Sequence, residues 1–415
     1  MKTRVKRIVI LSGSPLCTNP RVVKEARTLS DAGYEVTVLG AWLDAAAKEH
    51  DEELIARSHI DYRPVLDWTA QHPGGRTGRF WSRLRMKAGQ LIHAHAGREN
   101  SWQVGYAVSE LLKAALQSEG DLFIAHFEQT LVVAEQLLAR GCRVAVDMED
   151  WFSEDLLPEM RANRPVKLLR RLEQELLGRA AYATCTSLAM SQALALEYGC
   201  PAPAVVYNAF PWTDRQTIDG LVKDRVDLDR PSLHWYSQTL GPGRGIEDLL
   251  AALPDVKHEV EIHLRGNVTR GFEDWLASHT PESWKKRIFI HGLVSNSELL
   301  SRIAEHDIGF AGEMKYCRSR DLTVTNKILQ YLLGGLAVVA SDTAGQREIA
   351  SQSGSAVSLY HTGDPVALAR ALDGLLGNTE RLERAKSDAL QAAEREFCWE
   401  QQAPKLLESV EAARA

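Results

Sequence analysis

Apolar residues in this chain follow two alternating patterns, short unbroken runs and longer stretches at helical spacing. Residues 7–12 (RIVILS) and 336–340 (LAVVA) are apolar blocks of strand length, typical of strands buried on both faces of a parallel sheet. In 20–32 the apolar positions instead recur at intervals of three or four, and Gly33 ends the predicted helix. Such a strand-helix-strand succession predicts an α/β fold with doubly wound parallel sheets.

The length of the chain predicts two domains. Its 415 residues exceed the size of one ordinary domain and suit two of about 200 residues each. Residues 213–230 (TDRQTIDGLVKDRVDLDR) are polar and poor in aromatic side chains, so we expect a linker there. The predicted organisation is a first domain over 1–212, a second over 231–396, and a final helical segment over 397–415.

Composition narrows the class of protein. Charged residues make up 25% and hydrophobic residues 45%, as in soluble globular proteins, and the net charge of −6 with no aromatic-basic motif gives no reason to expect nucleic-acid binding. The six cysteines lack metal-ligand spacing, so we expect reduced thiols and no metal site. No apolar run approaches the length of a membrane span, and the start MKTRVKRIVILSGS resembles a first strand more than a signal peptide. We therefore expect a cytoplasmic protein.

One basic amphipathic segment leaves two interpretations open. Residues 76–98 interleave the aromatic Phe80 and Trp81 with arginines and a lysine. A segment of this kind suits peripheral contact with an anionic membrane surface. The interpretation that the sequence favours is a helix whose charged face is solvated and whose aromatic side chains pack onto the first domain.

An anion site is predicted near the second apolar block. Thr325 is a good N-cap before a helical apolar run, and the free N–H groups around Thr325, Asn326 and Lys327 attract an anion such as a diphosphate. Lys327 adds a positive charge. Arg244, between Gly243 and Gly245 at another predicted helix start, is also well placed to bind phosphate oxygens. The alternative is an ordinary helix-strand unit with both cations in solvent.

Polar residues also end two predicted strands of the first domain. His126 ends DLFIAH and Asp147 ends VAVD, with Glu149 and Asp150 shortly after it. Functional residues of open parallel sheets gather at the carboxyl ends of strands, which favours a role in a site. The alternative is a histidine whose bonds are satisfied in the core, beside acids that cap helices.

Several segments resemble glycosyltransferase family 4 and its relatives, in matching order along nearly the full chain. The run NKILQYLLGGLAVVASDTAG resembles the donor-binding segment of that family, and PRVVKEARTLSDAGYEVTVL resembles its opening. FCWEQQAPKLLESV resembles the terminal helix, which in the family crosses back to the first domain. The resemblance implies a GT-B fold, in which two Rossmann-like doubly wound parallel-sheet domains face a central cleft.

The resemblance also implies roles for the candidate residues. Those assigned to the donor site are Gly13, Gly243, Gly245, Thr325, Asn326 and Gln330; those assigned to catalysis are His126, Arg244 and Lys327; those assigned to the acceptor side are Asp147, Glu149 and Asp150. Gly13 would let the backbone approach the donor phosphates, and Arg244 and Lys327 would neutralise the leaving diphosphate.

The chain departs from the family pattern at several positions. Gln330 stands where the family has the glutamate that binds the ribose, and Leu322 stands where it has a second glutamate near the sugar. Gln238 is the nearest counterpart of the first of the two phosphate-binding cations. The amide of Gln330 can still bond a ribose hydroxyl. Glu313 and other charged side chains of the loop 312–321 are candidates to replace the missing carboxylate.

The implied activity is that of a retaining hexosyltransferase-type enzyme (EC 2.4). It would transfer a sugar from a nucleoside diphosphate sugar to a sugar, lipid-linked or other hydroxyl acceptor, without an obligatory metal or other cofactor. By family analogy it would serve polysaccharide, glycolipid or glycoconjugate biosynthesis, in the cytoplasm or at the inner face of the membrane. Two alternatives stay open: a nucleotide-sugar epimerase of the same fold, and a non-catalytic nucleotide-sugar-binding partner subunit, which the loss of both family glutamates motivates.

Overall fold

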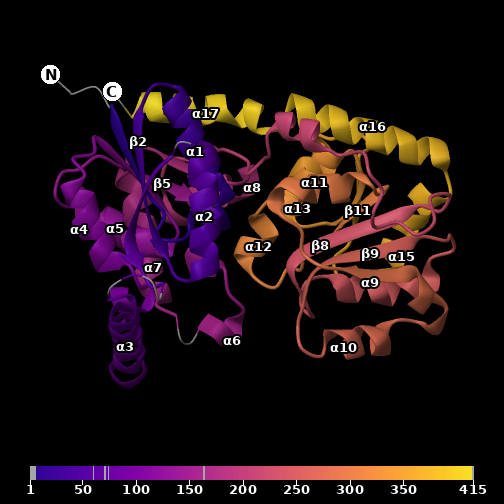
Figure 1. Ribbon diagram of the computed structural model, residues 1–415, viewed down its shortest axis with the longest axis horizontal. Helices are drawn as coiled ribbons and strands as arrows, with labels where there is room; N and C mark the ends of the chain where they lie inside the picture. The colour runs from indigo at the N-terminus through magenta and orange to yellow at the C-terminus, as the bar shows by residue number, and fades with distance from the viewer. Residues whose placement is uncertain (1–5, 59, 70–71, 73, 162–163, 414–415) are drawn as a thin grey trace. The chain divides into compact units, whose positions relative to one another are not determined.

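The computed structural model describes residues 6–58, 60–69, 72, 74–161 and 164–413. They form two compact units, one made of Met1–Val206 with Ala403–Ala415 and the other of Tyr207–Gln402. Each unit contains a parallel sheet flanked by helices (Figure 1). The predicted α/β fold with two parallel sheets is therefore confirmed.

The first unit has the strand order β3-β2-β1-β4-β5-β6-β7. The strands are β1 (Arg7–Leu11), β2 (Glu35–Trp42), β3 (Asp61–Asp67), β4 (Leu122–His126), β5 (Val144–Met148), β6 (Ala183–Cys185) and β7 (Ala204–Val205). Ile8 of β1 lies between Val36 and Leu122 of its two neighbours, and the paired strands run parallel. The apolar block 7–12 thus forms a central strand, as its pattern predicts.

Helices alternate with the strands of the first unit. They are α1 (Pro20–Asp31), α2 (Ala45–Ser58), α3 (Gly75–Ala96), α4 (Val108–Gln117), α5 (Glu128–Leu138), α6 (Pro158–Arg161), α7 (Val166–Arg179) and α8 (Leu188–Tyr198). Helix α1 starts where the Asn19 side chain accepts hydrogen bonds from the N–H groups of Arg21 and Val22, and Pro20 fills its first position. It ends just before Gly33, which has a φ of 88°.

The second unit repeats this arrangement with the strand order β10-β9-β8-β11-β12-β13. Its strands are β8 (Ser232–Leu240), β9 (Glu261–Val268), β10 (Ile288–His291), β11 (Ile308–Ala311), β12 (Ala337–Ser341) and β13 (Val357–Tyr360). Its helices are α9 (Ile246–Ala252), α10 (Phe272–His279), α11 (Asn296–Ala304), α12 (Arg318–Leu322), α13 (Asn326–Gly334), α14 (Ala344–Ser351), α15 (Pro365–Leu376) and α16 (Thr379–Arg395), and α17 (Trp399–Ala412) follows.

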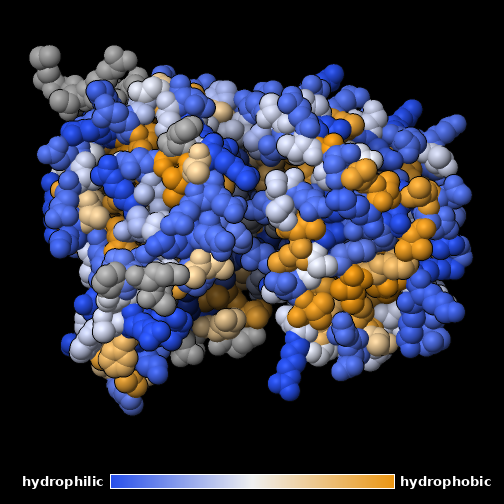
Figure 2. All heavy atoms as spheres, in the orientation of Figure 1, coloured by the Kyte–Doolittle hydropathy of each residue, from blue (hydrophilic) through white to orange (hydrophobic). Residues whose placement is uncertain are grey.

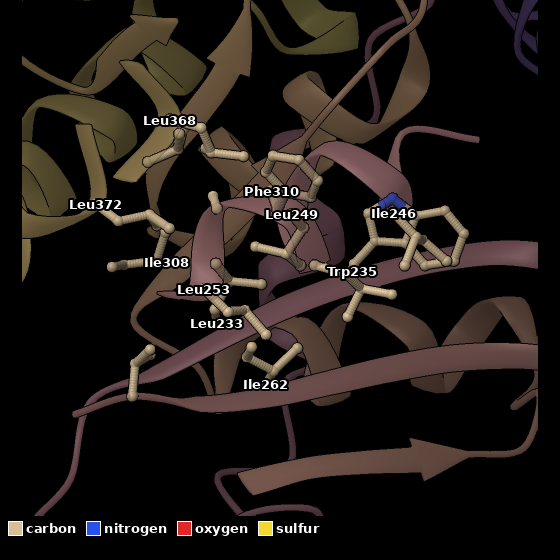
Figure 3. Close-up of a cluster of buried hydrophobic side chains, with 14 of the residues drawn as sticks. Leu233, Trp235, Ile246, Leu249, Leu253, Ile262, Ile308, Phe310, Leu368 and Leu372 are labelled. Carbon is tan, nitrogen blue, oxygen red and sulfur yellow. The ribbon is translucent and has the colours of Figure 1, made fainter. Parts of the chain in front are cut away.

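The core of the second unit packs one side of β8 against helices α9 and α15. Figure 3 shows Leu233 and Trp235 of β8 among leucines and isoleucines of those helices and of the neighbouring strands. Trp235 and Phe310 are fully buried. Hydrophilic side chains predominate on the face seen in Figure 2, with apolar ones between them. Burial of the apolar side chains of this core is the main stabilising contribution to the second unit.

In both sheets the strand order reverses beside the first strand, between β1 and β4 and between β8 and β11. Ligands of open α/β sheets bind outside the carboxyl ends of the strands at such a point. In the first unit Gly13 follows β1 with a φ of 64°, and its carbonyl accepts a 2.8 Å hydrogen bond from Gln129. In the second unit Gly245 has a φ of 84°, and a Cβ there would overlap the carbonyl oxygen of Gly312. The turn after β1 therefore touches the first turn of α5, and the loop after β8 touches the loop after β11.

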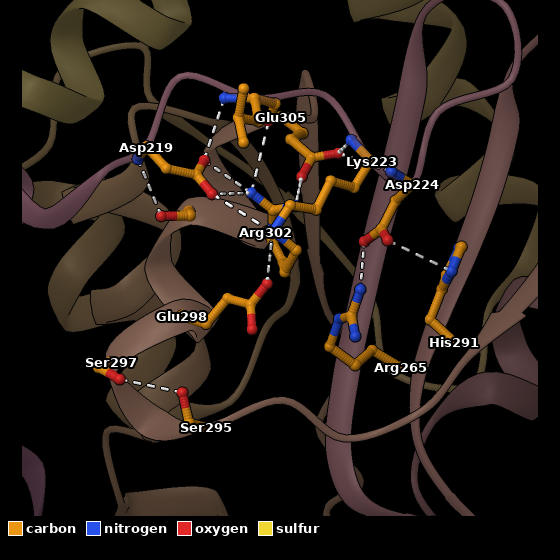
Figure 4. A network of polar contacts seen from close by, with 12 residues as sticks. Asp219, Lys223, Asp224, Arg265, His291, Ser295, Ser297, Glu298, Arg302 and Glu305 are labelled. Carbon is orange, nitrogen blue, oxygen red and sulfur yellow. Dashed lines mark hydrogen bonds and ion pairs between the residues drawn. The ribbon is translucent and has the colours of Figure 1, made fainter.

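The segment predicted as a linker, 213–230, lies within the second unit and is tied to it by ion pairs. Arg302 of α11 is buried and its guanidinium contacts the Asp219 carboxylate at 2.7 Å (Figure 4). Lys223 contacts Glu298 at 2.9 Å. The polar segment 213–230 is therefore held against the second unit by ion pairs of its charged side chains.

None of the helices that the structure describes is long and apolar enough to cross a membrane.

Candidate functional site

The predicted anion site lies in the second unit, at the start of α13. Thr325 precedes the helix in an extended conformation, as an N-cap residue does, but its hydroxyl caps no helix N–H group. It instead donates a 3.2 Å hydrogen bond to the carboxylate of Glu313. The first turn of α13 thus has no side-chain cap among the described residues, which leaves its N–H groups and the positive end of the helix dipole for a ligand.

Lys327 extends from this first turn and is not a free cation. Its ammonium lies 2.7 Å from Glu313 Oε1 and 5.7 Å from the centre of the Trp235 ring. Burial alone would raise the pKa of the Glu313 carboxyl, but the Lys327 ammonium outweighs burial and lowers that pKa below its ordinary value. Glu313 is therefore an anion at neutral pH, and a phosphate that binds Lys327 must share the lysine with it or displace it.

Arg244 occupies an exposed turn before α9, between two glycines of positive φ, Gly243 at 80° and Gly245 at 84°. Its guanidinium donates a 3.0 Å hydrogen bond to Ser237, and among the described residues it has no ion-pair partner. Since Gly245 lies against Gly312, the turn that carries Arg244 adjoins the loop that carries Glu313. The structure thus connects the Arg244 turn with the start of α13 through that loop.

Gln330 lies one turn further along α13 and is largely buried. Its side-chain carbonyl accepts a hydrogen bond from the hydroxyl of Tyr236 on β8. Tyr236 also packs edge-to-face against Tyr331. Asn326 accepts a 2.9 Å hydrogen bond from the Asn208 amide. The predicted donor residues of α13 are thus held by neighbours, among which Tyr236 had no sequence signal beyond its place in a buried strand.

Three candidate residues of the first unit, His126, Asp147 and Glu149, lie in a largely buried network that also contains Arg21 and Glu25, and we call it the His126 network. The imidazole of His126 lies 2.6 Å from Glu25 through Nε2 and 2.8 Å from Glu149 through Nδ1. Arg21 makes a two-point contact with Asp147, with Nη2 to Oδ1 at 2.9 Å, and donates a 2.7 Å hydrogen bond to the Val206 carbonyl. The side chains of His126, Arg21 and Asp147 are at most 3% exposed.

Electrostatics make His126 a cation in this network. Burial alone would lower the pKa of His126, but the carboxylates of Glu25 and Glu149 outweigh burial and raise it to about 10. Burial likewise opposes ionisation of Asp147, while Arg21 and His126 lower the pKa of its carboxyl. As an imidazolium with both nitrogens engaged, His126 has no lone pair with which to accept a proton at neutral pH.

The atoms of Glu25, His126 and Asp147 that are able to bind a metal lie within 4.8 Å of one another. Arg21 and the charged His126 already neutralise these carboxylates, so the network is better suited to an ion-pair cluster than to a metal. Glu25 was missed at the sequence level. The signal for it is weak: Arg21 and Glu25 are four residues apart on the buried face of α1.

The turn after His126 is strained. Phe127 has a φ of 65°, which few residues other than glycine adopt. The hydroxyl of Thr130 donates to the carbonyls of His126 and Phe127 and so holds the turn at the start of α5. Asp150, which was also predicted for the acceptor side, is partly exposed and lies two residues beyond the end of β5. His126, Asp147 and Glu149 thus come together, and their contact with a substrate stays a prediction.

A second buried group, the histidine cluster, consists of His234, His263, His291 and His306 of the second unit. The ring of His306 stacks on that of His234 at 4.8 Å between ring centres, and it lies tilted against that of His263 at 4.6 Å. His263 Nδ1 lies 3.0 Å from His291 Nε2, and Figure 4 shows Asp224 between His291 and Arg265. Burial lowers the pKa of His234, His263 and His291, so these three rings are neutral at neutral pH. His234 connects the cluster with the candidate site, because its ring stacks on Tyr236 and packs edge-to-face against Tyr331 of α13.

One family model matches a large part of the second unit. Residues 233–378 match the family model described as "Glycosyl transferases group 1". These residues include all of β8 except Ser232, as well as Arg244, Glu313 and the whole of α13. No curated protein matches the sequence.

Solved structures match nearly the full chain. Anabaena Alr3699/HepE in complex with UDP and glucose is 19% identical, with a TM-score of 0.69 over 98% of this chain and 99% of that one. Sucrose-phosphate synthase from Thermosynechococcus elongatus is 14% identical, with a TM-score of 0.71 over 97% and 98%. A glycosyltransferase from Rickettsia africae ESF-5 is 12% identical, with a TM-score of 0.65 over 99% and 98%. Residues 233–378 of the second unit are therefore similar to group 1 glycosyl transferases, and the chain has the GT-B fold.

Proposed function

We propose that the protein is a glycosyltransferase that moves a sugar from a nucleoside diphosphate sugar to an acceptor hydroxyl. The observation that carries the proposal is the uncapped start of α13 with Lys327, joined through the loop of Glu313 to the turn of Arg244. Both cations lie within the residues that match the group 1 family model. Backbone N–H groups, a helix dipole and two cations together suit a diphosphate.

The proposed chemistry is a front-face substitution with retention at the anomeric carbon. The bond from the anomeric carbon to the diphosphate oxygen breaks, a bond to the acceptor oxygen forms on the same face, and the acceptor proton passes to the leaving diphosphate. Arg244, Lys327 and the α13 start would stabilise the negative charge that develops on the diphosphate, which is the largest contribution expected here. Because these groups supply the positive charge, we propose that no metal is obligatory.

Glu313 has a distinct place in this proposal. It is the carboxylate next to the anion site, in a chain that has Gln330 and Leu322 at the two positions where the resembling family has glutamates. On donor binding, Lys327 would turn from Glu313 to the diphosphate, and the freed carboxylate would accept hydrogen bonds from sugar hydroxyls. We place the reaction in the cytoplasm and in polysaccharide, glycolipid or glycoconjugate synthesis.

Ligand-dependent thermal unfolding tests the site. UDP is the first probe, because the HepE structure is described as a complex with UDP, and GDP, ADP, TDP and CMP follow. A ligand at a hundred times its dissociation constant adds about 2.7 kcal/mol of stability, enough for a clear rise in Tm. We expect a selective rise with one nucleotide, and at least a tenfold weaker affinity (about 1.4 kcal/mol) in Arg244→Ala and in Lys327→Ala.

Lys286→Ala is the matched control, since Lys286 is an exposed cation of the same unit outside the site. It should bind the nucleotide as the unchanged protein does. Equal affinity in Arg244→Ala, Lys327→Ala and the control would refute the phosphate assignment.

A second candidate function is a non-catalytic nucleotide-sugar-binding subunit, favoured by Gln330 and Leu322. Gln330→Glu separates the two, because a glutamate at this position would still accept the Tyr236 hydrogen bond. Transfer by the variant but not by the unchanged protein would favour the non-catalytic function. Turnover of the nucleotide sugar without any acceptor would instead indicate an epimerase.

A further inference from the structure

Helix α3 of the first unit presents its bulky apolar side chains to solvent. Phe80, Trp81 and Leu91 are 61%, 58% and 58% exposed, and Leu84 and Ile92 are also exposed. Exposed apolar residues gathered in this way mark an interaction site more often than chance. The interpretation in which the aromatic side chains pack onto the first domain is therefore wrong.

The opposite side of α3 explains this orientation. Gly75, Ser82 and Gly89, spaced by seven residues, are buried. A Cβ at Gly75 would clash with the Thr69 carbonyl, and one at Gly89 would lie 2.8 Å from the Asn100 side chain. Small residues let the helix pack closely on the unit, so the bulky residues point outward. In Figure 1 α3 extends away from the sheet of its unit.

The charge of α3 identifies the kind of partner. The helix contains no aspartate or glutamate, in a chain with a net charge of −6. Its cations are Arg76, Arg79, Arg83, Arg85 and Lys87. Of these, only Arg85 has an ion-pair partner among the described residues, Glu110 at 3.5 Å. Four cations without an ion-pair partner on one exposed helix favour an anionic partner.

The positions of the cations and the apolar residues around the helix also suit a membrane surface. At 100° per residue, Phe80, Leu84 and Leu91 form one outward strip, with Lys87 and Arg83 along one edge of it. A hollow of about 820 Å³ beside this strip is lined by Arg76, Arg79, Arg83, Lys87, Phe80 and Leu84. Such a hollow offers cations to a phosphate and apolar surface to the chain attached to it. Figure 2 shows the mixture of hydrophilic and apolar side chains over α3.

We propose that α3 lies in the headgroup region of a bilayer leaflet that contains anionic phospholipid. Phe80, Trp81, Leu84 and Leu91 enter the boundary between headgroups and acyl chains, and the cations bind lipid phosphates. A helix with an apolar strip, flanking cations and an aromatic residue at the boundary is typical of in-plane membrane helices. The contact is peripheral, and it does not depend on the proposed glycosyl transfer.

Co-sedimentation of the full chain with vesicles tests this proposal. Vesicles of phosphatidylcholine alone are compared with vesicles of phosphatidylcholine and phosphatidylglycerol, at low and high salt. We expect binding to the anionic vesicles that weakens with salt, and little binding to the neutral ones. Binding to neither kind, or equal binding to both, would overturn the proposal and leave a protein or nucleic acid as the partner of α3.

Paired variants then assign the binding to α3. Arg79→Glu with Arg83→Glu should weaken binding about fivefold or more per cation, whereas Arg270→Glu with Lys286→Glu, which changes the charge equally in the second unit, should have little effect. Phe80→Ser with Trp81→Ser should also release the protein, whereas Leu196→Ser, at an 85% exposed leucine of α8, should not. All these side chains are exposed, so the melting temperature should stay unchanged, which separates lost binding from misfolding. Equal effects of test and control pairs would refute a specific role of α3.

Fluorescence locates Trp81 directly. Vesicles that contain brominated acyl chains should quench part of the tryptophan emission of the unchanged protein. Trp81→Phe keeps the apolar bulk and should lose that part of the quenching. Equal quenching of both proteins would show that Trp81 does not enter the bilayer.

Discussion

Both units bury histidines, but the two groups have opposite charge states. In the first unit His126 lies between the carboxylates of Glu25 and Glu149 and is held as a cation. In the second unit the rings of the histidine cluster stack on one another, and His234 has no hydrogen-bond partner among the described residues for either ring nitrogen. One unit thus stabilises a buried positive charge and the other excludes it.

The difference shows that neighbouring charges, rather than burial, decide the sign of a pKa shift. Burial lowers the pKa in both groups, since it disfavours the charged form. At His126 the carboxylates outweigh burial and raise the pKa to about 10. At His263 burial acts together with His306 and His291 and lowers the pKa to about 3. The stability of the two units should therefore depend on pH in opposite directions.

The largest expected effect comes from breaking the charge balance of the His126 network. Asp147→Asn keeps the shape of the side chain but removes the anion that faces Arg21 and His126. We expect the free energy of unfolding to fall by about 3–5 kcal/mol, because two buried cations lose a partner. Urea unfolding at neutral pH, followed by circular dichroism, measures the loss.

Arg179→Gln is the control for an ion pair that water screens. Arg179 and Glu175 form an exposed pair on α7, with a distance of 2.6 Å similar to those in the network. Its loss should cost at most about 0.5 kcal/mol. Losses of similar size in the two variants would mean that burial does not set the strength of the network.

Changes of pH should destabilise the two units at opposite ends of the scale. The folded pKa of His126 is above the unfolded value of about 6.5, so its contribution is full below that pH and is lost as the pH rises toward about 10. The folded pKa of His263 is below the unfolded value, so its contribution is full above about 6.5 and is lost as the pH falls toward about 3. Each group changes the free energy of unfolding by about 1.4 kcal/mol per pH unit inside its window.

Limited proteolysis assigns each loss of stability to a unit. At about pH 5 the first cuts should fall within 207–402, and at about pH 9 within 1–206, because these units lose stability there. The sites are read by mass spectrometry of the fragments. First cuts in the same unit at both ends of the pH range would contradict the comparison between the two histidine groups.

The alternation of apolar blocks and helical spacing was sufficient to predict the fold. RIVILS and LAVVA became β1 and β12, and the helix predicted after Asn19 became α1, because strand and helix patterns are local properties of the chain. The role of 213–230 was harder to predict. Its charges are held by Arg302 and by Arg265, more than 35 residues away in the sequence, and nothing in a polar stretch shows where its partners are.

The geometry of the candidate site could be predicted only in part, because some of its contacts join segments that are distant in the sequence. Lys327 and Arg244 stand at helix starts, as local signals predict, but the pairing of Lys327 with Glu313 depends on how two loops meet. His126 was found as the end of a strand, whereas its charge depends on Glu25 from a distant helix. Positions follow from local pattern, and charge states follow from tertiary contacts.

The smallest expected effect, and the most direct test of the neutral state of His234, is a gain of stability in His234→Phe. The phenylalanine ring keeps the stacking on His306 and Tyr236 and removes two buried nitrogens that lack partners among the described residues. We expect a gain of about 1–2 kcal/mol in the free energy of unfolding at neutral pH, because no hydrogen bond is lost. The gain should grow as the pH falls below about 6.5, since one fewer histidine binds a proton on unfolding.

His306→Phe is the matched control for this prediction. This variant loses the 3.1 Å hydrogen bond to Ser232, so its stability should rise less than that of His234→Phe or should fall. A His234→Phe variant less stable than the unchanged protein would mean that the ring nitrogens of His234 contribute to the fold, and the contrast with His126 would then rest on charge alone.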